Sequence, residues 1–113
     1  MKLGGIILFI KDMQRAIVYY RDIIGLHPDE EQPYSADSFF RFDTGQCKLC
    51  LHKAGKPNGG RQKIVFHVES VSEVHRNLKA KGLQLRPLKN EDGLAVFDIR
   101  DPEGNRIQFW GSY

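Results

Sequence analysis

Cysteine is scarce in this chain of 113 residues, which has only Cys47 and Cys50. So few cysteines exclude a small secreted scaffold held together by disulfides. The two thiols lie three positions apart in a strand-like run, where residues at that spacing point to opposite faces. We therefore expect two small buried thiols here, and neither a zinc site nor a redox pair.

Long apolar runs are also missing. No stretch approaches the roughly 20 apolar residues that a membrane-spanning helix needs. The segment 4–10 is too short for a signal peptide, and its flanking residues do not match one. We expect no membrane partner and a cytoplasmic location.

Neither sign of charge dominates. The 17 basic and 14 acidic residues leave a net charge of +3, and the basic residues are spread along the chain without a block. This distribution predicts a soluble single domain with mild attraction to anions, and it argues against nucleic acid as a partner. There is also no Ser–His–Asp order, phosphate-binding loop or HExxH motif.

The clearest feature present is a hairpin near the end of the chain, at residues 95–110. Apolar and polar residues alternate on both sides of a turn, Asp101-Pro-Glu-Gly-Asn105. Pro102 presets the backbone of the turn, and Gly104 can adopt a positive φ. The alternation predicts two strands with one apolar face and one more polar face.

The first half of the chain predicts a strand, a helix and a hairpin. Asp12 is placed to cap a helix whose apolar positions recur as far as Ile24, and Gly25 ends it. The predicted strands are residues 6–10, one short strand between 28 and 37, and a hairpin formed by 39–42 and 47–52.

A linker rich in glycine and proline, at about 54–62, precedes a second half with the same order of elements. Ser70 and Glu73 form a capping box at the start of a helix that Gly82 ends. The predicted strands are residues 63–68, 84–88 and the two arms of the terminal hairpin. Corresponding positions in the two halves lie about 58 residues apart, so the chain is an internal repeat.

Two motifs resemble the vicinal oxygen chelate superfamily, which includes glyoxalase I, extradiol dioxygenases, fosfomycin-resistance enzymes and bleomycin-resistance proteins. They are Tyr19-Tyr-Arg-Asp-Ile-Ile-Gly-Leu26, following Asp12, and Arg100-Asp-Pro-Glu-Gly-Asn105. The resemblance implies an α+β fold in which two βαβββ modules form a curved mixed sheet around a central cleft. The modules are then residues 1–53 and 63–113, joined by the linker 54–62 in a single domain.

The resemblance also identifies where metal enzymes of the superfamily carry their ligands, usually His or Gln and Glu. The matching positions here are Gly5, Cys50, Lys63 and Gln108. They offer one thiol, one amide and an adverse positive charge, whereas a catalytic ion needs several N, O or S donors. We therefore expect no metal and no cofactor.

Strand parity assigns the residues of the implied cleft. The face that would lie beneath the helices is apolar almost throughout, whereas the opposite face mixes aromatic and polar side chains. The ligand-binding candidates on that opposite face are Phe9, Phe39, Arg41, Cys50, His52, Lys63, His67, Asp98, Gln108 and Trp110. Apolar walls with a few convergent polar groups are typical of sites for small organic ligands.

Several interpretations of these candidates stay open. Phe9, Phe39 and Trp110 fit ligand stacking and also fit dimer or lid packing. His67 and Asp98 are weak candidates for an acid/base pair, because imidazole titrates near neutral pH. A histidine in a strand is more often a hydrogen-bonded wall residue.

The leading functional hypothesis is a metal-free protein that binds a small organic molecule, with the sequestration of an antibiotic or toxic metabolite as its role. The alternative is a glyoxalase-like lyase, isomerase or dioxygenase with an atypical site. A third hypothesis is a structural or regulatory dimer without a ligand. We expect a homodimer in each case, because open sheets with exposed edges gain from isologous pairing.

Overall fold

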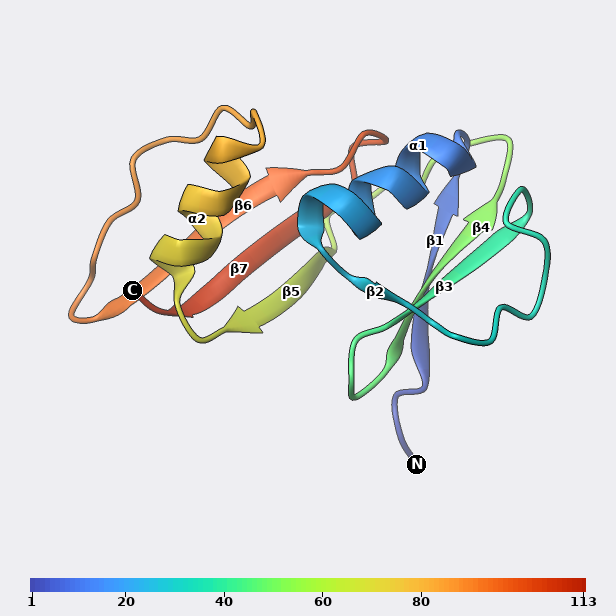
Figure 1. The fold of residues 1–113 in the computed structure, drawn as a ribbon, viewed down its shortest axis with the longest axis horizontal. Coiled ribbons are helices and arrows are strands. Elements are labelled where there is room, and N and C mark those ends of the chain that lie inside the picture. The colour runs from blue at the N-terminus through green and yellow to red at the C-terminus, as the bar shows by residue number, and fades with distance from the viewer. The chain divides into compact units, whose positions relative to one another are not determined.

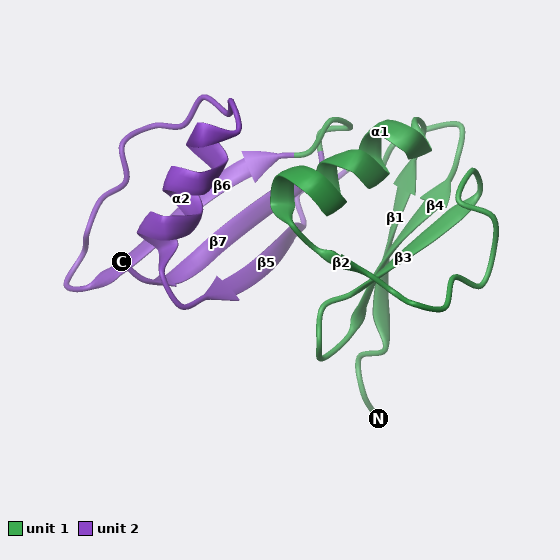
Figure 2. Cartoon of the chain, viewed as in Figure 1, with its two compact units in different colours: residues 1–59, 101–104 green, residues 60–100, 105–113 purple.

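Two mixed β-sheets, each with its own helical segment, make up the computed structural model, which describes residues 1–113 (Figure 1). The chain divides into two compact units, residues 1–59 with 101–104 and residues 60–100 with 105–113 (Figure 2). The division falls within the predicted linker. None of the helices is long and apolar enough to cross a membrane.

The first unit contains a four-stranded sheet in the order β1-β4-β3-β2. Strand β1 is parallel to β4, and the other neighbours are antiparallel. The register places Leu8 beside Leu51 and Phe42 beside Leu49, and all four side chains are buried. The elements are β1 (Gly5–Ile10), α1 (Met13–Val18), η1 (Tyr19–Ile24), β2 (His27–Pro28), β3 (Phe39–Asp43) and β4 (Lys48–Lys53).

The second unit contains a three-stranded sheet in the order β5-β7-β6, again with its first strand parallel to its last. The rings of Phe66 and Phe97 both stack on Phe109, at centroid distances of 5.6 and 5.2 Å. Ile107 beside Ile99 extends this buried apolar face. The elements are β5 (Lys63–Val68), α2 (Val71–Ala80), β6 (Leu94–Arg100) and β7 (Arg106–Ser112).

The internal repeat and the α+β class are confirmed, but the second module has one strand fewer than predicted. Gln84–Leu88 is not a strand. The carbonyl oxygen of Arg86 instead lies 2.8 Å from Nε2 of His75 on α2, and no backbone hydrogen bond joins the segment to β6. The second module is therefore βαββ.

The predicted helix caps are confirmed, and the predicted form of the first helix is wrong in its second half. Asp12 accepts a hydrogen bond from the Arg15 amide, and Ser70 accepts one from the Glu73 amide. The first helix is α-helical only to Val18 and then continues as the π-helical η1. The Gly25 amide donates to the carbonyl of Tyr20, five residues back, and Gly25 adopts φ 89°. Apolar periodicity alone does not distinguish this wider turn from an α-helix.

The two motifs that carry the family resemblance meet inside the first unit. Tyr20 of η1 is fully buried and donates a 2.6 Å hydrogen bond to the buried carboxylate of Asp101. In the same turn, the Glu103 carboxylate accepts hydrogen bonds from the amides of Lys11 (2.6 Å) and Asp12 (2.5 Å). The 101–104 turn thus contacts both the beginning of the helical segment and the start of η1.

Candidate functional site

The sheet face turned away from the helix in the first unit carries exposed apolar side chains. Ile7 is 50% and Phe9 45% exposed, although their neighbours Leu8 and Ile10 on the same strand are buried. The register aligns Phe9 with His52 and Phe39, and it aligns Ile7 with Cys50 and Arg41. The candidates Phe9, Phe39, Arg41, Cys50 and His52 therefore lie on one face of this sheet.

Four rings on this face form what we call the aromatic cluster: Phe9, Tyr34, Phe39 and His52. His52 makes edge contacts with Phe9 at 5.7 Å and with Phe39 at 5.9 Å, and Tyr34 meets Phe39 at 5.5 Å. Nδ1 of His52 lies 3.0 Å from the carbonyl oxygen of Lys53, which orients the imidazole ring. Tyr34 escaped the sequence analysis because it lies in an irregular loop without a periodic pattern.

An ion cluster occupies the other end of this face. Asp29 lies 2.8 Å from Nε of Arg41 and 3.0 Å from Nζ of Lys48, and Lys48 also approaches Asp43 at 3.6 Å. The hydrogen bond from Lys48 is the main reason that the pKa of Asp29 lies below its ordinary value. Arg41 is therefore already neutralised by a carboxylate that the sequence pattern did not connect with it.

Cys50 lies between these two groups and is nearly inaccessible. Its side chain is buried, with 7% exposure, beside Ile7 and Arg41 in the register. Burial raises the pKa of the Cys50 thiol, so the neutral form is favoured. A neutral buried thiol is neither a ready nucleophile nor a good metal ligand.

The corresponding face of the second sheet is built around Asp98. Its carboxylate binds Nζ of Lys63 at 2.6 Å and Nε2 of Gln108 at 2.9 Å. Burial acts to raise the pKa of Asp98, but these two hydrogen bonds and the charges of Lys63 and Arg106 outweigh it and hold the pKa below its ordinary value. Asp98 is thus an anchored anion at pH 7 and not a proton donor.

His67 and Trp110 form a second aromatic pair on the face of this sheet. Their rings lie 4.6 Å apart, and Trp110 remains 44% exposed. The sheet register places His67 in the row of Trp110 and Val96, whereas Asp98 lies in the adjacent row with Gln108 and Val65. Each of the two weak acid/base candidates therefore has its own partner, and no hydrogen bond joins them.

The four positions where the resemblance implies metal ligands do not fit a metal. Gly5 offers no donor, and a Cβ built there would lie 3.0 Å from the carbonyl oxygen of Lys48. Lys63 and Gln108 both donate to Asp98, which leaves an ammonium where a ligand atom is needed. No group of three or more His, Cys, Asp or Glu side chains in the chain is arranged to hold an ion.

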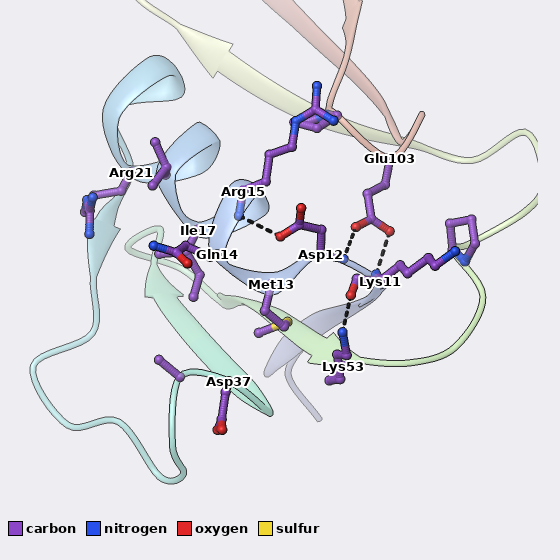
Figure 3. Close-up of a pocket in the computed structure, with 14 residues that line it drawn as sticks. Lys11, Asp12, Met13, Gln14, Arg15, Ile17, Arg21, Asp37, Lys53 and Glu103 are labelled. Carbon is purple, nitrogen blue, oxygen red and sulfur yellow. Dashed lines mark hydrogen bonds between the residues drawn. The ribbon is translucent and has the colours of Figure 1, made fainter.

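A hollow of about 1040 Å³ lies elsewhere in the first unit, around α1 (Figure 3). Several of its polar groups already have structural partners. Glu103 binds the Lys11 and Asp12 amides, and Lys53 donates to the carbonyl of Lys11. These contacts hold the segment at the start of α1 in place, so the polar groups in the hollow are already engaged. The sheet faces are therefore the better candidate sites.

Comparison with known proteins identifies the family. The model of the Glyoxalase/Bleomycin resistance protein/Dioxygenase superfamily matches residues 2–109. No curated protein matches the chain.

Solved structures with the same fold span nearly the whole chain. Lactoylglutathione lyase from Agrobacterium tumefaciens is 21% identical, with a TM-score of 0.75 over 96% of this chain and 92% of that one. TioX from Micromonospora sp. ML1 is 23% identical, with a TM-score of 0.78 over 100% of both chains. A superfamily member from Sphaerobacter thermophilus is 17% identical, with a TM-score of 0.75 over 99% and 98%. The chain belongs to the glyoxalase/bleomycin resistance protein/dioxygenase superfamily.

Proposed function

We propose that this protein binds a small, partly aromatic organic molecule without a metal, and that it acts by sequestering an antibiotic or a toxic metabolite. The aromatic cluster is the observation that carries the proposal. It places the half-exposed ring of Phe9 beside His52 and Phe39 on an open sheet face. Exposed aromatic groups of this kind mark ligand or partner sites, because a monomer gains nothing by leaving them in water.

The charged groups near the cluster support binding more than catalysis. Arg41 is paired with Asp29, and Lys63 with Asp98, so each cation is held in place by a carboxylate. Such pairs can orient a polar group of a ligand, and they leave no acid or base poised for proton transfer.

An enzymatic role is the alternative, as a lyase, isomerase or dioxygenase with an atypical site. The name of the Agrobacterium relative, a lactoylglutathione lyase, favours it. His67 is the residue on which it would depend, because its imidazole stands on the open face against Trp110.

A thermal-shift screen tests the proposal, using a panel of aromatic antibiotics and metabolites with and without added divalent metals. A ligand that raises the melting temperature without metal is then measured against Phe39→Ala and His52→Ala. Loss of one ring contact weakens binding by about three- to tenfold, given the typical value of an aromatic pair. Val18→Ala is the control, since Val18 is 41% exposed and lies on α1.

Two results would contradict the proposal. One is a ligand whose affinity is unchanged in both cluster variants. The other is binding or turnover that appears only with a metal, which would favour the enzymatic alternative.

A further inference from the structure

We propose that Nε2 of His52 is a hydrogen-bond acceptor that selects the ligand of the aromatic cluster, a flat aromatic molecule with a hydroxyl or N–H group on its ring. The inference names the ligand class of this site and rests on the proposed function. It starts from the two nitrogen atoms of one imidazole ring, which differ in what they contact.

The hydrogen of the His52 imidazole is fixed on Nδ1. This atom lies 3.0 Å from the carbonyl oxygen of Lys53. A carbonyl oxygen only accepts hydrogen bonds, so Nδ1 carries the hydrogen that it donates. A neutral imidazole has a single ring N–H, and Nε2 is therefore left with a lone pair. The backbone of the next residue thus makes His52 an acceptor at Nε2.

Nε2 of His52 lies at the outer end of the ring and has no partner of its own. The side chain is exposed, and its hydrogen bond within the chain is the one at Nδ1. Side chains stand roughly perpendicular to a sheet, and Nε2 is farther from the Cβ atom than Nδ1 is. This acceptor is therefore open to a molecule that approaches the sheet face.

The neighbouring strands place an aromatic ring on each side of His52. The register aligns Phe9 on β1 and Phe39 on β3 with His52 on β4. Both phenyl rings make edge contacts with the imidazole, at interplanar angles of 70° and 86°. Neighbouring strands are about 4.8 Å apart, so β1 and β3 are roughly 10 Å apart with the imidazole midway. An aromatic ligand that contacts both phenyl rings lies over His52, within reach of Nε2.

A fixed turn holds the fourth ring of the cluster, Tyr34, against Phe39. The carbonyl oxygen of Ser35 accepts hydrogen bonds from the amides of Ser38 and Phe39 and from the Ser38 hydroxyl, each at 3.0 Å. The rings of Tyr34 and Phe39 meet at 5.5 Å. The aromatic wall is thus formed before a ligand binds, and a polar group is what orients the ligand within it.

The other three histidines do not offer this combination. Nε2 of His75 lies 2.8 Å from the carbonyl oxygen of Arg86, so its ring hydrogen is on the opposite nitrogen from that of His52. His67 contacts one aromatic ring, and His27 contacts none. His52 alone combines aromatic rings on both sides with an acceptor nitrogen whose state the backbone fixes.

The position of the ring hydrogen is tested first, without a ligand. Long-range hydrogen–nitrogen NMR correlation spectra of the full chain distinguish the two tautomers at about pH 8, where imidazole side chains are generally neutral. We expect the hydrogen of His52 on Nδ1 and that of His75 on Nε2, so the two residues serve as references for each other. A hydrogen on Nε2 of His52 would overturn this inference and leave the proposed function standing.

Two probes that differ in one donor test the selection. 2-Naphthol carries a hydroxyl, whereas 2-methoxynaphthalene has the same rings and cannot donate. The ether is the more apolar of the two, so burial alone would favour it. Titrations followed by the amide signals of the aromatic cluster should nevertheless give a Kd about three- to tenfold lower for 2-naphthol, which is the value of one neutral hydrogen bond.

Substitutions at His52 assign this preference to Nε2. His52→Phe keeps a ring between Phe9 and Phe39 and removes the acceptor, so the two Kd values should agree within about twofold. His52→Gln supplies a carboxamide oxygen and should restore part of the preference. His27→Phe makes the same exchange of an exposed side chain on β2, outside the cluster, and should keep the wild-type preference.

The outcomes separate this inference from the proposed function. Equal Kd values for the two probes in the wild type would overturn the inference and leave aromatic binding intact. A preference for 2-naphthol that persists in His52→Phe would assign the selection to another group and would also overturn it. If neither probe shifts the amide signals of Phe9, Phe39 and His52, the aromatic cluster is not a ligand site, and both proposals are wrong.

Discussion

The buried hydrogen bond between Tyr20 and Asp101 is predicted to hold the two family motifs together. Tyr20→Phe removes only the hydroxyl that donates to Asp101 at 2.6 Å, while the ring that packs 6.2 Å from Phe42 is retained. Burial is the main reason that the pKa of Tyr20 is raised, with the Asp101 carboxylate adding to it, so the hydroxyl stays protonated and donates.

The cost of the substitution follows from the charge and burial of its partner. Asp101 is 5% exposed, so water does not readily replace the lost donor. A hydrogen bond to a charged group contributes about 1.5–3 kcal/mol to the free energy of unfolding. For a domain of this size, that corresponds to a melting temperature lower by roughly 6–12 °C.

Urea unfolding followed by circular dichroism measures this loss. Tyr34→Phe is the matched control, because Tyr34 is 67% exposed, and its stability should stay within about 0.5 kcal/mol of the wild type. The coupling is checked in a double-mutant cycle with Asp101→Asn. A Tyr20→Phe protein as stable as the control would refute the inference that this bond joins the motifs.

Four further predictions concern stability, metal and assembly. The pKa of Asp98 is depressed in the folded state, so the stability it contributes is present above the unfolded pKa of about 4 and is lost as the pH falls through the lower folded value. Asp98→Asn should therefore reduce the difference between the urea midpoints measured at neutral and at acid pH. Gly111→Ala should lower the free energy of unfolding by on the order of several kcal/mol, because φ is 153° and a Cβ would overlap the Val68 carbonyl oxygen. A variant that denatures like the wild type would count against that geometry. Elemental analysis of the purified protein should find no stoichiometric Zn²⁺, Ni²⁺, Mn²⁺ or Fe²⁺, and about one ion per chain, lost on replacing Cys50 or Gln108, would contradict this. Sedimentation should show a homodimer at micromolar concentration, and a species of 13.0 kDa would exclude it.

Local signals in the chain were sufficient for most of the architecture. The capping residues Asp12 and Ser70 lie at the helix starts because their side chains satisfy exposed amides there. Alternation in β1 predicted that Leu8 is buried and Phe9 is not, since neighbouring strand residues point to opposite faces. In both halves the first strand lies parallel to the last, so the predicted repeat is also present in the sheet topology.

Local signals of this kind could not predict the contacts between segments that are distant in the sequence. The sequence determined which residues share a face of a sheet, and it could not determine that Asp29 neutralises Arg41 or that Tyr34 joins the aromatic cluster, because both come from an irregular loop. It likewise predicted a strand at Gln84–Leu88 from local pattern alone. Strand pairing depends on competition with other partners, and here the tertiary structure gives the Arg86 carbonyl to His75 in place of β6.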